Sequence, residues 1–207
     1  MCKKQILYSC LGILFLAFGS CTTKEIDAKD YLDYIDDPDN GLRKTKVVAG
    51  LELDLAYRPS DALILLKTNS EEEFLNLDLD KERSAYKDLQ YYYLRLRVRD
   101  REKEGTTLLN WQVYDQAASK RRLQYLSFDM AEDILLIDGG DSLKPSLYQF
   151  ERSYNMSKYG GFLLAFKTNE NSKKADKTFV LDSEEFQIAP IKLFFSGEQI
   201  KNTPKIK

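Results

Sequence analysis

Histidine and cysteine, two residue types often used as nucleophiles, general bases or metal ligands, are absent or scarce in this chain. It contains no histidine and only three cysteines. Without histidine, the chain cannot supply a Ser-His-Asp triad, a histidine general base or a histidine-ligated metal. Catalysis would have to use carboxylates, lysine, tyrosine or serine. Paired carboxylates, as in glycoside hydrolysis, are the simplest of these options, but no spacing among the 33 acidic residues singles out a pair.

The three cysteines all lie close to the N-terminus. Cys2 precedes, and Cys10 lies within, an uncharged and largely apolar run of fifteen residues from Ile6 to Ser20. This run is short for a membrane-spanning helix, which needs about 20 apolar residues. It is typical of the apolar region of a secretory signal peptide. Residues 1–20 are therefore expected to be removed on export, together with Cys2 and Cys10.

The third cysteine follows this run directly and changes the kind of anchor that is expected. The residues Phe18-Gly19-Ser20-Cys21 resemble the lipobox of bacterial lipoproteins. That resemblance implies cleavage after Ser20 and lipid attachment to Cys21, so that acyl chains would hold the mature protein on a membrane. No cysteine would then remain for a disulfide, a thiol nucleophile or a zinc site. We expect no catalytic residue, cofactor or metal site in the mature domain.

The residues after Cys21 bear on the location of the protein. Lys24-Glu25, with Asp27 close behind, resembles the export signal of surface lipoproteins in Bacteroidota. Ser127-Phe128-Asp129-Met130 is among the stretches that resemble short envelope lipoproteins of the same phylum, a group with no activity attached to it. The resemblance implies an envelope protein, anchored in the outer membrane, and leaves surface-facing and periplasm-facing display equally open. Residues 21–27 are expected to form a lipidated tether.

Charge argues against one class of partner and points to another. The chain has 31 basic and 33 acidic residues, whereas nucleic-acid-binding domains are normally basic. One segment is locally basic, because Arg95, Arg97 and Arg99 alternate with apolar residues. In a strand these arginines would share one face at a spacing of about 6.6 Å. Their repulsion needs an offset, either from acids on neighbouring strands or from an anionic partner such as an acidic glycan or another envelope protein.

Two acidic stretches are weaker candidates for ligand binding. The stretch from Asp36 to Gly41 places a glycine at the sixth position of a calcium-loop pattern, but Pro38 occupies the third, where a ligand is needed. Asp138-Gly139-Gly140-Asp141 has the composition of an ordinary hairpin turn. Both are interpreted as turns.

Apolar and polar residues alternate over much of the chain after residue 42, which predicts strands. The clearest strand is Tyr92 to Arg99. Leu51 to Tyr57 is expected to form a strand with one buried face, paired with Lys46 to Val48 through a turn at Ala49-Gly50. Further strands are expected at 108–114, 123–128, 133–138, 147–154, 162–167, 178–181 and 191–196, with turns at Gly139-Gly140 and Gly160-Gly161.

Helix signals concentrate in the first third of the chain. Asp27 and Ser70 are placed as N-cap residues, and short helices are expected near 31–35, 62–67, 74–77 and 81–89. These patterns predict a mainly β (α+β) fold, an antiparallel β-sandwich-like domain with short N-terminal helices, spanning residues 28–207 as one unit. The expected function is that of a non-enzymatic binding or structural component of the cell envelope. The alternative is a small glycan-processing enzyme that uses two carboxylates.

Overall fold

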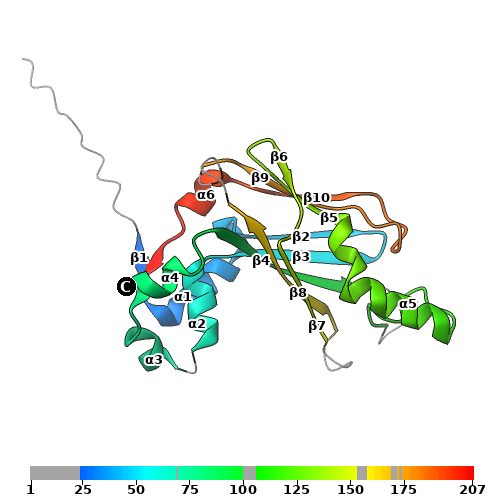
Figure 1. Cartoon of the computed structure of the whole chain (residues 1–207), viewed down its shortest axis with the longest axis horizontal. Coiled ribbons are helices and arrows are strands. Elements are labelled where there is room, and N and C mark those ends of the chain that lie inside the picture. The colour runs from blue at the N-terminus through cyan, green and yellow to red at the C-terminus, as the bar shows by residue number, and fades with distance from the viewer. Residues whose placement is uncertain (1–23, 69, 100–105, 153–157, 169–171, 173) are drawn as a thin grey trace, which may run out of the picture.

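The computed structural model describes residues 24–68, 70–99, 106–152, 158–168, 172 and 174–207 (Figure 1). The predicted signal peptide, the predicted lipid-attachment residue Cys21 and the first residues of the predicted tether lie outside these ranges. Within them, two antiparallel sheets and several helices make up the fold.

The larger sheet has five strands. A hairpin at one edge of this sheet turns at Ala49-Gly50, whose φ angles of 48° and 87° are the positive values that a tight hairpin turn requires. In order across the sheet, the strands are β2 (Arg43–Val48), β3 (Leu51–Arg58), β4 (Leu89–Val98), β8 (Gly160–Lys167) and β7 (Leu147–Glu151).

The smaller sheet has four strands and comes from the second half of the chain. The predicted turn at Gly139-Gly140 is confirmed, since both glycines have positive φ and join two of its strands. In order, the strands are β10 (Ile191–Phe195), β9 (Lys177–Leu181), β5 (Ile134–Asp138) and β6 (Asp141–Leu143).

The two sheets enclose one hydrophobic core. Tyr92 of β4 lies within it, with its ring 5.4 Å from Tyr57, 5.8 Å from Phe166 and 5.6 Å from Phe195, all at edge-on angles. Phe195 belongs to the opposite sheet, so these contacts join the two layers. The predicted β-sandwich-like α+β fold is confirmed.

A second, smaller core lies at one end of the sandwich. It is built from buried side chains that include Tyr31, Ile35, Phe74 and Ile206. Most of the helices are gathered there (Figure 1): α1 (Ala28–Asp36), α2 (Ser60–Lys67), α3 (Glu71–Leu75) and α4 (Leu79–Ser84). A short 3₁₀ turn, η1 (Pro38–Asn40), follows α1.

The two ends of the described chain are paired beside these helices. β1 (Glu25–Ile26) forms a parallel pair with β11 (Lys205–Ile206), which follows α6 (Gly197–Lys201). Two residues of the stretch expected to be a tether are therefore part of the folded domain.

Two predicted strands are wrong. Residues 108–114 form turns that bury Leu108 and Trp111, and residues 123–128 belong mainly to α5 (Gln116–Ser127). The side chain of Asp115 caps this helix by accepting from the backbone N–H of Ala118 at 2.7 Å. The helix lies at the opposite end of the sandwich from α1 to α4 (Figure 1) and is followed by η2 (Asp129–Asp133).

Two further boundaries also differ from the prediction. Gly160 and Gly161 begin strand β8 and do not form a turn. A Cβ atom at Gly161 would collide with the hydroxyl of Tyr93 on the neighbouring strand, so close side-chain approach explains this glycine. The segment expected to be helical at 81–89 ends as helix at Ser84, and Leu89 already begins β4.

Candidate functional site

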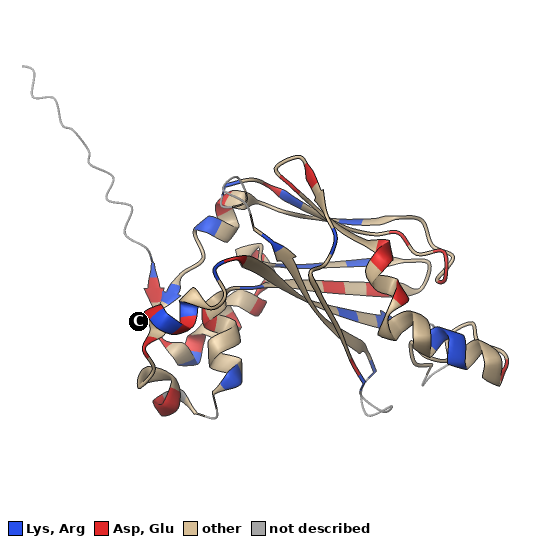
Figure 2. Ribbon diagram, viewed as in Figure 1, with Lys and Arg blue, Asp and Glu red and all other residues tan. Residues whose placement is uncertain are grey.

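The outer face of the larger sheet carries a row of opposite charges. Strand register places Glu52 opposite Arg97, and Asp54 opposite Arg95. Side chains alternate between the two faces of a strand, so these four groups point away from the core that the intervening leucines fill. Figure 2 shows acidic segments of β3 lying between basic segments of β2 and β4.

Asp54 is held by two arginines from different strands. Arg43 of β2 donates from Nε to Oδ1 at 2.8 Å and from Nη2 to Oδ2 at 2.6 Å, which is a two-pronged contact. Arg95 of β4 brings its Nη2 within 2.6 Å of Oδ2. Both carboxylate oxygens of Asp54 are therefore in contact with guanidinium nitrogen atoms.

Glu52, two residues before Asp54 on β3, is also held by two arginines. Arg97 donates from Nη2 to Oε1 at 2.6 Å, and Arg99 donates from Nε to Oε2. The side chain of Glu52 is 8% exposed, whereas those of Arg97 and Arg99 are 40% and 55% exposed. The acids form the floor of the site and the arginines lie over them at the solvent.

These residues line one open groove of about 310 Å³, together with Thr45 and Tyr159. The guanidinium group of Arg95 lies 5.6 Å from the centre of the Tyr159 ring, in the position of a cation–π contact. We call the set of Arg43, Arg95, Arg97, Arg99, Glu52 and Asp54 the arginine groove. It contains four guanidinium groups and two carboxylates, which leaves an excess of two positive charges.

One further acid lies on this face without lining the groove. Glu151 of β7 accepts a hydrogen bond from the hydroxyl of Tyr93 at 2.5 Å. Burial, and then this hydrogen bond, raise the pKa of Tyr93 above its ordinary range, so the phenol stays protonated and remains the donor. Glu151 is therefore engaged beside the groove and does not pair with its arginines.

The structure places the three predicted arginines side by side and adds a residue that sequence reasoning missed. Arg95, Arg97 and Arg99 all line the groove, and Arg43 joins them from β2. The signal for Arg43 was present, because the Ala49-Gly50 hairpin fixes which β2 residues share a face with Asp54. The prediction of one buried face for β3 is wrong, since the arginines also cover Glu52 and Asp54.

The acid pair in this groove does not have the layout of a catalytic pair. Each of the four carboxylate oxygens of Glu52 and Asp54 contacts an arginine nitrogen, so both acids are engaged in ion pairs within the protein. In the part of the chain that the structure describes, no three acidic or cysteine side chains are grouped so that they could hold a metal ion.

A second charged cluster lies inside the sandwich. Asp138, which is fully buried, accepts from Lys177 Nζ at 3.0 Å, from Gln90 Nε2 at 2.7 Å and from the hydroxyl of Ser172. Lys177 also donates to the backbone carbonyl of Ala175 at 3.1 Å. One cation faces one anion, and both are surrounded by further hydrogen-bond partners.

No protein family, no curated protein and no solved structure matches this chain. Among the described helices, none has the length and apolar character needed to cross a bilayer.

Proposed function

We propose that this chain is a lipid-anchored, non-enzymatic binding protein of the bacterial cell envelope, and that its arginine groove binds an acidic glycan. The observation that carries the proposal is the charge imbalance in the groove, where four guanidinium groups lie over two carboxylates. The chain as a whole has a net charge of −2, so this local excess is opposite in sign to the rest of the molecule. An anionic ligand would neutralise it.

The chemistry of the lining favours a glycan over a protein partner. The centres of protein–protein interfaces are depleted in charged residues and carry apolar or aromatic anchors. This groove instead has charged walls, one threonine and the ring of Tyr159. Guanidinium groups match the planar carboxylates and the sulfates of acidic glycans through paired hydrogen bonds, and an aromatic ring offers a surface to a sugar ring.

The alternative of a carboxylate-dependent glycan-processing enzyme has less support. Glu52 and Asp54 share an open groove, but each of them is paired with two arginines, which favours a structural role for these acids over a catalytic one. We therefore keep binding, without catalysis, as the proposed activity.

The anchor in this proposal rests on the lipobox-like residues Phe18 to Cys21. Cys21→Ser removes the thiol that would carry the lipid, so the variant is expected to lose acylation and membrane retention. Metabolic labelling with a clickable fatty acid in the bacterial host measures this directly. Equal labelling of the variant and the unaltered chain would remove the anchor from the account.

The groove is tested by binding of the purified full chain to polygalacturonate and to heparin, with dextran as a neutral control. Both anionic glycans are expected to bind, dextran is not, and binding should weaken as salt screens the charges over about 10 Å at 0.1 M. Polyglutamate serves as a third arm. If polyglutamate binds and the two glycans do not, the partner is an acidic protein segment, and if none binds the proposal fails.

A further inference from the structure

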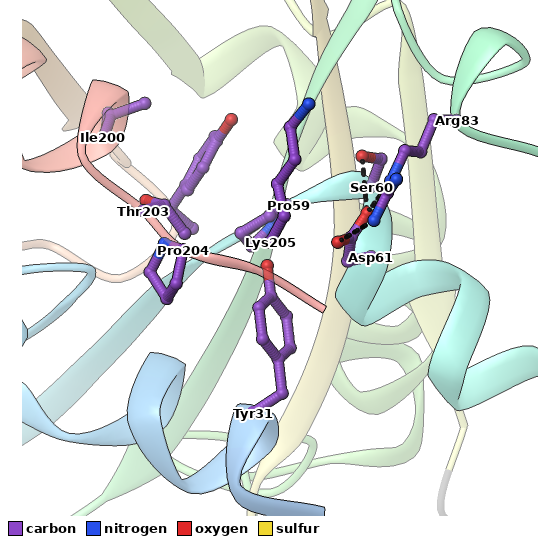
Figure 3. Close-up of a pocket in the computed structure, with 10 residues that line it drawn as sticks. Tyr31, Pro59, Ser60, Asp61, Arg83, Ile200, Thr203, Pro204 and Lys205 are labelled. Atoms are coloured by element: carbon purple, nitrogen blue, oxygen red, sulfur yellow. Dashed lines mark hydrogen bonds and ion pairs between the residues drawn. The ribbon is translucent and has the colours of Figure 1, made fainter. Parts of the chain in front are cut away.

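A separate cavity lies at the helical end of the molecule, away from the arginine groove. It is open to solvent, has a volume of about 240 Å³ and is bordered by α1, the start of α2, α4 and the C-terminal segment (Figure 3). Its lining combines hydroxyl groups, aromatic rings and short apolar side chains: Tyr31, Tyr57, Pro59, Ser60, Asp61, Arg83, Ile200, Thr203, Pro204 and Lys205.

One wall of the cavity is a closed ion pair that holds the fold together. Arg83 donates from Nε and Nη2 to the two oxygens of Asp61 at 2.7 and 2.8 Å, and the same Nη2 donates to the carbonyl of Ile206 at 3.1 Å. The backbone N–H of Ile206 in turn donates to Asp61 at 2.8 Å. The pair therefore fastens β11 and has little hydrogen-bonding capacity left for a ligand.

Unlike Asp61 and Arg83, the two tyrosines that line this cavity have hydroxyl groups without a hydrogen-bond partner in the described part of the protein. Tyr31 is 1% exposed, and Figure 3 shows its side chain rising from α1 toward the middle of the lining residues. Within the described part of the chain, neither Tyr31 nor Tyr57 makes a side-chain hydrogen bond. Burial, and then the charge of Asp61, raise the pKa of Tyr31, and burial raises the pKa of Tyr57 to about 12. Both phenols therefore remain protonated donors at neutral pH.

Several tyrosines elsewhere in the molecule do have hydrogen-bond partners for their hydroxyl groups. The hydroxyl of Tyr148 donates to the carbonyl of Leu126 at 2.5 Å, and that of Tyr92 donates to Gln90 at 3.3 Å. Tyr125 donates to Asp133 and also contacts Ser183. Among the described residues, neither of the two cavity tyrosines has its hydroxyl oxygen buried without a partner, so both hydroxyls reach the solvent of the cavity and can donate to water or to a ligand that replaces it there.

We propose that this cavity binds one sugar residue, or a polyhydroxylated ligand of similar size, as a site distinct from the arginine groove. Tyr31 and Tyr57 would donate to its oxygen atoms, and the hydroxyl of Thr203, which donates to Gln199 at 3.3 Å, keeps lone pairs for accepting. Pro59, Pro204 and Ile200 supply apolar surface for the C–H face of a sugar ring.

The size of the cavity limits the ligand. At about 30 Å³ for each water molecule in the liquid, a volume of about 240 Å³ corresponds to roughly eight waters. That is space for a single ring with its substituents, and less than the 300 to 1,000 Å³ typical of sites for drug-sized ligands.

The test uses the full chain with glucose, galactose, mannose and N-acetylglucosamine at millimolar concentrations, followed by saturation-transfer NMR and thermal unfolding. At least one sugar is expected to bind and to raise the melting temperature. Tyr31→Phe and Tyr57→Phe should each lower that affinity about tenfold, because each removes one donor. Neither substitution removes a hydrogen bond within the protein, so both variants should unfold at the same temperature as the unaltered chain, or slightly higher.

Tyr148→Phe is the matched control. It removes a hydroxyl that has a protein partner outside the cavity, so it should lower the melting temperature and leave sugar binding unchanged. The proposal is overturned if none of the four sugars binds. It is also overturned if the Tyr31 and Tyr57 variants bind sugar as the unaltered chain does, or lose as much stability as Tyr148→Phe.

Discussion

The buried Asp138–Lys177 network and the arginine groove both join carboxylates to cations, but they differ in how the charges are balanced. Inside the sandwich one lysine faces one aspartate, and Gln90, Ser172 and a backbone carbonyl occupy the remaining positions. On the outer face of the larger sheet, four arginines share two carboxylates. The charges of the buried network therefore cancel, whereas the arginine groove keeps an excess of two positive charges.

Solvent explains why both arrangements can exist in one fold. A buried charge must be matched and fully hydrogen-bonded, because desolvation costs several kcal/mol for each ion. At an open face, water solvates whatever charge is left over. Removing one ion of the buried network would therefore leave the other ion buried without a partner, whereas the excess charge of the groove lies where solvent can reach it.

The largest expected effect comes from unbalancing the closed network. Lys177→Met leaves Asp138 buried without its cation and should cost about 3–5 kcal/mol of unfolding free energy. Urea denaturation measures this loss. Lys144→Met is the control, since Lys144 is 48% exposed and pairs with the exposed Glu132, so its loss should cost less than about 1 kcal/mol. Similar losses for the two variants would show that the network is not a closed unit.

Alkaline pH is expected to destabilise the core through its buried tyrosines. Burial, and then the neighbouring Tyr57 and Asp138, raise the pKa of Tyr92 well above its ordinary value of 10, and burial raises the pKa of Tyr57 to about 12. Folded phenols with raised pKa values hold protons that the unfolded chain releases. The stability is therefore complete below about pH 10 and falls as the pH rises toward 12, by about 1.4 kcal/mol per pH unit for each phenol.

Urea midpoints measured at several pH values, with phenol ionisation followed by absorbance, test this expectation. A urea midpoint that stays constant from about pH 10 to 12 would contradict the account of the buried phenols.

A smaller effect is expected from removing one acid of the groove. Glu52→Gln raises the excess positive charge from two to three, so polygalacturonate should bind several-fold more tightly. Stability should fall by about 1–2 kcal/mol, because two charge-assisted hydrogen bonds are weakened. Glu132→Gln makes the same change of charge at a side chain that is 82% exposed, and should leave both quantities unchanged. Unchanged or weaker glycan binding by Glu52→Gln would argue against an anion site.

The sequence alone was enough to predict the local part of the groove. Alternation along β4 placed Arg95, Arg97 and Arg99 on one face, and the Ala49-Gly50 turn placed β2 beside β3. The floor was not predictable, because the pairing of β3 with β4 joins residues that are far apart in the chain. The sequence does not decide whether acids of the chain or an external partner offset the charge of these arginines. The structure shows that Glu52 and Asp54 offset part of it.

The errors in secondary structure have a related cause. The apolar and polar residues from Leu123 to Phe128 fit both the two-residue repeat of a strand and the 3.6-residue repeat of a helix. The N-cap residue that begins α5, Asp115, lies eight residues before Leu123. The sugar-sized cavity was beyond sequence reasoning altogether. Tyr31, Tyr57 and Thr203 lie on three separate elements, and only tertiary packing brings them together.

The central claim, that excess positive charge in the groove binds an acidic glycan, is tested most directly by neutralising that excess. Arg95→Gln with Arg99→Gln leaves Asp54 paired with Arg43 and Glu52 paired with Arg97, so each acid keeps one partner. Unfolding free energy should therefore change by no more than about 1 kcal/mol.

The matched control is Lys44→Gln with Lys46→Gln, which removes the same charge from β2 at positions that alternate with Arg43 and Thr45. The measurement is the affinity for polygalacturonate at low salt. We predict that the arginine variant loses at least about tenfold in affinity, or about 1.4 kcal/mol, while the lysine variant binds as the unaltered chain does. Equal affinities for the two variants would contradict the claim.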